Sequence, residues 1–395
     1  MKKSLYISYS FVLALAVLLS VASCVEPIEI ELDEPESILV VEGIITDELK
    51  QQEIKLSRSF PVDENGPNPV SGAKVIVSSS NGANYTFFES EAGTYLSNSA
   101  FQVNLGEDYT LEIETEEGVY ESTTARSETT TQISEVSSEK AVLNGEEGVA
   151  ITVSNTGISG NGGSYYLFKY QETYEIRSPY EKLYDLIINE NDDPDTDRDD
   201  FLVVPKPEQD YICYVTEPSS DIILSNTEGL TEDSLNGILI RFISKKEYEL
   251  AYRYSINVTQ LKVSPVAFDY YETLKNLSEN ESVFSQYQPG FLNGNIRSLN
   301  NSKEKVIGYF TTATTDSKRL FFDYTDYYDG NNRRPSHTGD CEEYVPNRES
   351  LRELLENGQV KLFAEDPPNV YQVIRRGCVD CTQFGSNQKP EFWID

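Results

Sequence analysis

The residues with the clearest potential for chemistry stand near the end of the chain, where Cys378 and Cys381 form a Cys-x-x-Cys pair. Such a pair occurs in dithiol redox centres, in half of a zinc site, or in structural disulfides. A thioredoxin-like centre would open a helix after a strand, but Gly385 and Pro390 follow here and predict a loop. A zinc site lacks further ligands, because His337 is the only histidine of the chain. The compartment of the protein therefore decides the chemistry of this pair.

The first 24 residues have the layout of a secretory signal. Lys2 and Lys3 precede an apolar segment over residues 7–21, and small residues follow up to Cys24. This ending is similar to the lipobox of bacterial lipoproteins, in which the cysteine is acylated and becomes the first residue after cleavage. The alternatives are an ordinary signal peptide and a membrane-spanning helix, for which the apolar run is shorter than the roughly 20 residues required. We predict a signal peptide over residues 1–23 and a lipid anchor at Cys24.

The charge of the chain limits its partners. It carries 66 acidic and 32 basic side chains, a formal net charge of −34 at pH 7. Such a surface repels nucleic acid, so we predict no nucleic-acid binding. Acidic residues crowd the segment directly after Cys24, which resembles the export signal that moves lipoproteins of the Bacteroidota to the outer face of the outer membrane. We expect an acidic tether over residues 24–36 and a protein that faces the cell exterior; a merely solvated tether is the alternative.

Because we expect the protein to be exported, disulfide formation is the favoured role of the remaining cysteines. These are Cys213, Cys341, Cys378 and Cys381, an even number. Four cysteines allow three pairings. Their separations in sequence favour the pairings in which Cys213 and Cys341 each reach the C-terminal tail.

Short segments rich in Val, Ile, Tyr, Phe and Thr recur about every ten residues, the spacing of an antiparallel sandwich. The first expected strands lie at residues 37–46, 53–60, 73–80, 84–90, 93–98 and 108–115. Residues 123–134 are expected to form a linker or boundary strand. Later strands are expected at residues 148–155, 164–176, 210–217, 237–244, 253–263, 305–314 and 319–326. Two helices are expected, one from Ser264 and Pro265 and one from Asn347 to Gly358.

These elements predict a mainly β protein. An immunoglobulin- or prealbumin-like antiparallel sandwich is expected over residues 37–128. A larger β-rich domain with a few short helices is expected over residues 129–395, and it ends in a disulfide-anchored tail. Trp393, the only tryptophan, is expected to pack in that tail.

Two further motifs have weaker chemical meaning. Asp193, Asp195 and Asp197 have the alternate spacing of a calcium loop, but Arg198 replaces its glycine and Val204 its bidentate glutamate. A solvated acidic loop is therefore the favoured interpretation, with calcium as the alternative and no other cofactor expected. Ser234 follows Asp233 and precedes an apolar residue, which resembles an O-glycosylation signal of the Bacteroidota.

The sequence offers no signature of catalysis. His337 lies in a polar loop with no metal-ligand companion and no nucleophile elbow, and phosphate-binding loops are absent. We therefore expect no enzyme, although a glycosidase needs only two carboxylates and these would be hidden among so many acids.

The order of several motifs resembles one family over nearly the whole mature chain. The motifs read "LVVEGIIT", "VSGAKVIV", "GTYLS" and "LGEDYTLEI" in the first part, then "ICYVTE" and "VSPVAFDYYETL", and finally "CVDCTQFGSNQKPEFW". The sequence is similar to Bacteroidota lipoproteins of the domain-of-unknown-function 4249 family. The resemblance implies a surface lipoprotein of the outer membrane that works beside a TonB-dependent transporter in nutrient uptake. A surface adhesion or structural role is the alternative, and an uncatalogued hydrolase a further one.

Overall fold

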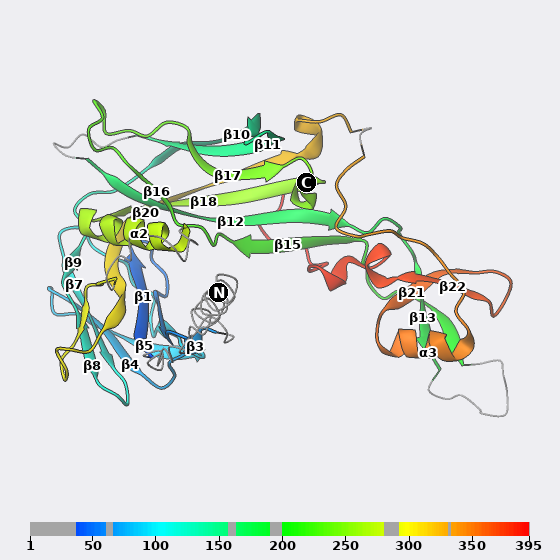
Figure 1. Cartoon of the computed structure of the whole chain (residues 1–395), viewed down its shortest axis with the longest axis horizontal. Coiled ribbons are helices and arrows are strands. Elements are labelled where there is room, and N and C mark those ends of the chain that lie inside the picture. The colour runs from blue at the N-terminus through cyan, green and yellow to red at the C-terminus, as the bar shows by residue number, and fades with distance from the viewer. Residues whose placement is uncertain are drawn as a thin grey trace, which may run out of the picture.

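The computed structural model describes residues 37–60, 66–156, 163–189, 200–279, 292–330 and 333–394. It confirms a mainly β fold, which is elongated and built from packed sheets (Figure 1). The strands are β1 (Leu39–Thr46), β2 (Glu53–Arg58), β3 (Asn68–Pro69), β4 (Lys74–Ser79), β5 (Asn84–Glu91), β6 (Thr94–Ser97), β7 (Asp108–Glu114), β8 (Val119–Ser122), β9 (Ala125–Arg126), β10 (Ile133–Leu143), β11 (Glu146–Asn155), β12 (Tyr165–Arg177), β13 (Tyr184–Ile188), β14 (Phe201–Pro205), β15 (Ile212–Pro218), β16 (Ile223–Asn226), β17 (Ile238–Ser244), β18 (Arg253–Val263), β19 (Ile296–Ser298), β20 (Val306–Asp323), β21 (Val360–Glu365) and β22 (Tyr371–Arg375). The helices are α2 (Pro265–Glu279) and α3 (Arg348–Glu356), with short 3-10 turns η1 (Tyr248–Leu250), η2 (Tyr324–Asp326), η3 (Arg376–Cys378) and η4 (Cys381–Gln383). No helix in these ranges is long and apolar enough to cross a membrane.

The N-terminal sandwich consists of β1 to β9 together with β19 and the first half of β20. Its strands alternate as expected from the sequence: Val75 and Val77 of β4, and Leu111 and Ile113 of β7, are buried while their neighbours face outward. The buried side chains of both layers form one apolar core.

This core crosses the expected boundary at residue 128. β19 pairs with β8, and β20 pairs with β1 in parallel from Leu39 opposite Val306 to Thr46 opposite Ala313. It is the only parallel pairing among the strands that the structure describes. Phe310 of β20 is fully buried in the core of the N-terminal sandwich. Residues 296–313 therefore complete a unit that otherwise lies within residues 37–128.

β20 is a single strand of 18 residues where two strands were expected, at 305–314 and 319–326. The expectation of two separate strands was therefore wrong. Both neighbours satisfy the polar stretch between these two segments in extended form: Asp47 accepts from the Thr315 amide at 2.8 Å, and the Asp316 carboxylate accepts from the Ile133 amide at 2.7 Å. The second half of β20 continues as the antiparallel partner of β18.

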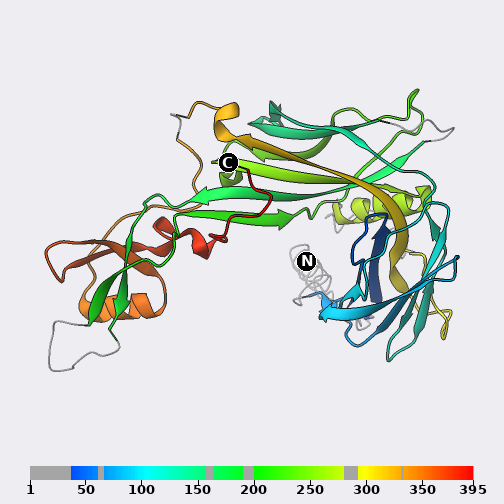
Figure 2. The ribbon, with the colours of Figure 1, turned by 180° about the vertical axis from the view of Figure 1, so that it is seen from behind.

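The central sandwich packs the three-stranded sheet β10-β11-β17 against the sheet β15-β12-β18-β20 (Figures 1 and 2). Helix α2 packs beside the same four-stranded sheet in a separate apolar cluster, which includes Phe268 and Leu274. The Ser264 hydroxyl accepts from the Ala267 amide at 3.2 Å, so the expected start of this helix is confirmed.

The distal module lies at the other end of the molecule from the N-terminal sandwich (Figure 2). It contains the hairpins β13–β14 and β21–β22 and helix α3, which begins at the expected cap: the Asn347 side chain accepts from the Ser350 amide. None of these four strands was expected from the sequence. The two hairpins come from segments about 150 residues apart, and they share one apolar cluster with α3.

Candidate functional site

The Cys-x-x-Cys pair forms two different disulfides. Cys381 is bonded to Cys213 of β15, and Cys378 is bonded to Cys341. The pair itself is therefore not a redox dithiol or a zinc ligand set in this structure, and the expectation of disulfides is confirmed. The Cys213–Cys381 bond ties the tail to the central sandwich. The Cys341–Cys378 bond joins the segment before α3 to the segment after β22.

A buried carboxylate stabilises the turn between these two bonds. Asp380 accepts from the Arg376 side chain at 2.8 Å and from the Thr382 amide at 2.9 Å, and its own side chain is 4% exposed. Burial alone would raise the pKa of this carboxyl, but the hydrogen bonds from Thr382 and Arg376 outweigh it and lower the pKa. Asp380 is thus an ionised anchor inside the tail.

A second ion pair lies against the same tail. Lys206 donates to the Asp210 carboxylate at 2.5 Å and to the Val379 carbonyl at 3.3 Å. The Cys381 amide donates to the Asp210 carbonyl at 2.8 Å. Burial raises the pKa of Asp210 in spite of this lysine. The segment that connects β14 to β15 is therefore fixed to the tail by polar contacts, and β15 itself is fixed to it by the Cys213–Cys381 disulfide.

Trp393 packs against the sheet of the central sandwich, and its expected packing at the tail is confirmed. It is 5% exposed, and its ring lies 5.0 Å from that of Tyr214 and 5.8 Å from that of Phe321, both edge to face. The last residues of the chain thus cover the sheet of the central sandwich.

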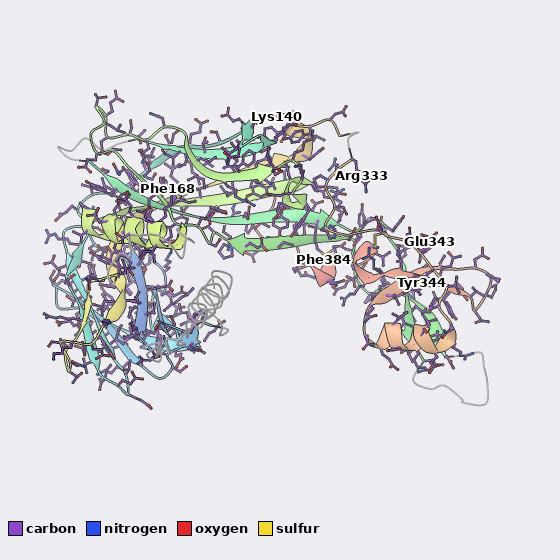
Figure 3. All side chains as sticks on the ribbon, viewed as in Figure 1. Lys140, Phe168, Arg333, Glu343, Tyr344 and Phe384 are labelled. Carbon is purple, nitrogen blue, oxygen red and sulfur yellow. A yellow bond between two sulfur atoms is a disulfide. The ribbon has the colours of Figure 1, made fainter. Side chains whose placement is uncertain are left out.

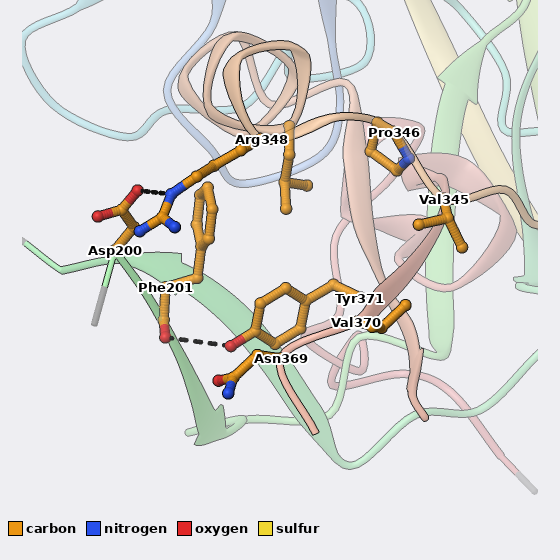
Figure 4. Close-up of a pocket in the computed structure, with 9 residues that line it drawn as sticks. Asp200, Phe201, Val345, Pro346, Arg348, Asn369, Val370 and Tyr371 are labelled. Carbon is orange, nitrogen blue, oxygen red and sulfur yellow. Dashed lines mark hydrogen bonds and ion pairs between the residues drawn. The ribbon is translucent and has the colours of Figure 1, made fainter. Parts of the chain in front are cut away.

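The distal module contains a hollow of about 240 Å³ (Figure 4). It is lined by Asp200, Phe201, Val345, Pro346, Arg348, Leu351, Asn369, Val370 and Tyr371. The Tyr371 hydroxyl donates to the Phe201 carbonyl at 3.4 Å, and the two rings meet edge to face at 5.8 Å. Arg348 is hydrogen-bonded to Asp200 across its rim (Figure 4).

An ion pair and apolar side chains line this hollow. Arg348 neutralises the Asp200 carboxylate, Arg352 lies 3.8 Å from the same carboxylate, and apart from Asn369 the remaining wall is aromatic or aliphatic. Its lining offers no Ser, Thr, Cys or His to act as nucleophile or base. The volume is below the roughly 300 Å³ at which small-molecule pockets begin.

The outer face of the distal module is partly apolar. Ile187 and Leu202 lie directly opposite each other in the β13–β14 hairpin and are 42% and 41% exposed. Leu183 and Val345 are also exposed, and Figure 3 shows Tyr344 on the same module. Exposed apolar side chains that lie together, as Ile187 and Leu202 do, are typical of interaction surfaces.

The other expected site residues are distributed as follows. Cys24 and the calcium candidates Asp193, Asp195 and Asp197 lie outside the described residues. Val204, the twelfth position of that calcium motif, is part of β14. In the described ranges, no group of three His, Cys, Asp or Glu residues could hold a metal ion.

Ser234 and His337 both lie in loops of the described chain. Ser234 is half-buried, and the preceding Asp233 carboxylate accepts from the Ser164 hydroxyl at 2.9 Å. Glycosylation of Ser234 stays a prediction. The His337 ring is packed edge to face against Tyr248 and Phe384, and burial lowers its pKa.

Sequence reasoning missed the distal module and its hollow. The alternation in "VKLFAE" (360–365) was the available signal, since Val360 and Leu362 are buried. The apolar run "FLVVP" (201–205) was the other signal. It was not predicted as a strand, because the acidic segment before it was interpreted as a loop with a possible calcium motif.

Comparison with known families agrees with this architecture. A family model described as "Domain of unknown function (DUF4249)" matches residues 25–319, which include the N-terminal sandwich and all of the central sandwich except the end of β20. The "CVDC" turn and β21–β22 lie beyond the match, which is shorter than the resemblance seen in the sequence. No curated protein matches the chain. The chain belongs to the family of domain of unknown function DUF4249.

Proposed function

We propose that the protein is a surface lipoprotein, anchored at Cys24 in the outer membrane, that serves as the accessory partner of a TonB-dependent transporter in nutrient uptake. The observation that carries this proposal is the exposed apolar face of the distal module, at the opposite end of the molecule from the sandwich that follows the anchor. The lipobox-like ending at Cys24 supports the anchor.

The distances along the chain agree with such an arrangement. The N-terminal sandwich begins at Leu39, and thirteen residues after Cys24 reach Ser37. A chain of this length spans at most about 45 Å. In the proposed arrangement, the N-terminal sandwich lies within about 45 Å of the membrane, and the distal module at the other end of the body is free to extend farther from it.

The docking surface suits a protein partner. Ile187 and Leu202 form an exposed apolar pair on a hairpin that is joined to the β21–β22 hairpin by the Lys361–Asp185 ion pair and the Tyr371–Phe201 hydrogen bond. A rigid, partly apolar surface loses little conformational entropy on binding. The strongly acidic remainder of the molecule disfavours contact with anionic surfaces and so restricts docking to this face.

The test is affinity purification of the tagged full chain from its host in mild detergent, with mass spectrometry of the partners. We expect a transporter in stoichiometric amount with the wild-type chain and at least tenfold less with Ile187→Ser/Leu202→Ser. The matched control is Leu49→Ser, which removes a 68% exposed leucine near β1 on the N-terminal sandwich and should leave recovery unchanged. Recovery of the lipoprotein without any transporter would refute the proposal.

The anchor is tested separately by membrane fractionation and labelled-lipid incorporation. Cys24→Ser should abolish lipid incorporation and release the protein from membranes. Full membrane retention and unchanged labelling of this variant would show that the anchor lies elsewhere.

A further inference from the structure

A second, larger hollow of about 770 Å³ lies between the central sandwich and the distal module. Its lining includes Lys245 and Lys246 after β17, Tyr324 at the end of β20, and the segment 333–341. Figure 3 shows Arg333 at this junction. The volume is within the range of small-molecule sites.

The charge of this hollow is opposite to that of the chain. Four cationic side chains line it, Lys245, Lys246, Arg333 and Arg334, against the single carboxylate of Asp340. The protein as a whole has a net charge of −34. A local positive field inside an acidic molecule concentrates anions at one place on its surface.

These cations are only partly neutralised. Lys246 pairs with Glu146 at 2.8 Å but is 82% exposed, and Lys245 lies 3.5 Å from Glu147. Exposed pairs of this kind are weak and can be exchanged for a ligand. Arg333 has no ion pair within the part of the chain that the structure describes. The hollow thus contains positive charge that the nearby carboxylates do not fully neutralise.

Arg334 is held in a fixed orientation. Its guanidinium lies 4.9 Å from the ring of Tyr252 and 5.2 Å from that of Tyr324, and it donates to the Ala251 carbonyl at 2.9 Å. A guanidinium has five donors, and this hydrogen bond uses one of them. A fixed, planar donor group is what recognition of carboxylate or phosphate requires.

An independent observation comes from Tyr324. This residue lines the hollow and is 1% exposed, yet its hydroxyl has no hydrogen-bond partner in the described chain. A buried hydroxyl without a partner is costly, so such groups are usually satisfied by a ligand or another polar group. An oxyanion bound by Arg334 would accept this hydrogen bond.

We propose that the hollow binds a compact organic polyanion, whose phosphate or carboxylate groups are held by Arg333, Arg334 and Lys246 and by the Tyr324 hydroxyl. The rings of Tyr180 and Pro335 cover the carbon skeleton. The proposal goes beyond the accessory role, because it concerns a different surface and is tested without the transporter.

The test is calorimetric titration of the purified full chain with pyrophosphate, with citrate and with uncharged glucose. We expect saturable binding of at least one anion, no binding of glucose, and weakening of anion binding as salt rises. Tighter binding of pyrophosphate identifies phosphate as the recognised group, and tighter binding of citrate identifies carboxylate. No saturation by either anion up to about 10 mM would overturn the proposal.

Variants locate the binding. Arg333→Gln should weaken anion binding about tenfold, and Tyr324→Phe, which keeps the ring, about fivefold. Arg297→Gln is the matched control, since this 72% exposed arginine lies on β19 in the N-terminal sandwich. Should Arg333→Gln lose the native Trp393 fluorescence, the exposed Lys246→Gln replaces it. Equal affinities in these variants and in the control would refute the assignment.

Discussion

The N-terminal sandwich and the distal module are stabilised in different ways. The core of the N-terminal sandwich contains 19 buried side chains from two packed layers, whereas that of the distal module contains seven. A core as small as the latter provides too little apolar burial to offset the conformational entropy of its chain. The segment of the distal module that contains α3 and β21–β22 is instead closed by the Cys341–Cys378 disulfide, and the tail that follows it is bonded to the central sandwich by the Cys213–Cys381 disulfide.

The two regions also differ in how their stability responds to reductant and to pH. Apolar packing is insensitive to reductant and to pH, while disulfides and carboxylates respond to both. The sole tryptophan, Trp393, packs on β15 and β20 of the central sandwich, in the tail that follows the distal module. Its fluorescence therefore reports on the attachment of this tail, and hydrogen exchange of β1 reports on the N-terminal sandwich.

The largest effect is expected from Cys213→Ser/Cys381→Ser. The bond closes a loop of 168 residues, and the chain-entropy relation gives a loss of about 5 kcal/mol in the free energy of unfolding. Urea unfolding followed by Trp393 fluorescence should show an earlier transition, while exchange in β1 stays slow. An unchanged fluorescence midpoint would contradict the role of this bond.

Phe310→Ala should weaken the other region by about 4 kcal/mol, because it leaves a cavity where a fully buried ring was. Faster hydrogen exchange in β1, its parallel partner, is the measurement. The Trp393 transition serves as the internal control and should move much less. A larger shift there than in β1 would mean that the two regions unfold as one.

Asp380→Asn should destabilise the tail by about 3 kcal/mol at pH 7, because Arg376 loses its buried partner. The pKa of Asp380 is lowered in the folded chain. Its contribution is therefore complete above the unfolded value of about 4 and is lost as pH falls below it. Wild type and variant should converge in acid, whereas the exposed control Asp221→Asn should match wild type throughout.

The smallest effect is expected from Asn347→Ala, which removes the cap of α3. The Asn347 side chain accepts from the Ser350 amide at 2.9 Å, and loss of such a cap costs about 1 kcal/mol. Exchange of the Ser350 and Leu351 amides should accelerate. Asn347→Asp keeps the acceptor and should retain slow exchange; acceleration in both variants would refute the capping role.

Much of the fold could be predicted because its information is local. Alternating residues identify β4 and β7, and the pair Ser264 and Pro265 identifies the start of α2. The strands β13 and β21 escaped prediction, because each is short and the apolar cluster that buries them joins segments far apart in sequence. The polar centre of β20 was not expected to be part of a strand for the same reason, since its hydrogen-bond partners Asp47 and Ile133 are distant in sequence.

The sequence by itself determined the mainly β class, the two helix starts and the presence of disulfides, because periodicity, capping and an even number of cysteines depend on residue types alone. Only the tertiary structure decided the pairing of Cys213 with Cys381, the parallel contact of β1 with β20, and the gathering of Arg333 and Arg334 with Lys245 at one hollow. These features join residues that are many tens of positions apart. Their proximity is set by how the packed sheets close on one another, which no local pattern contains.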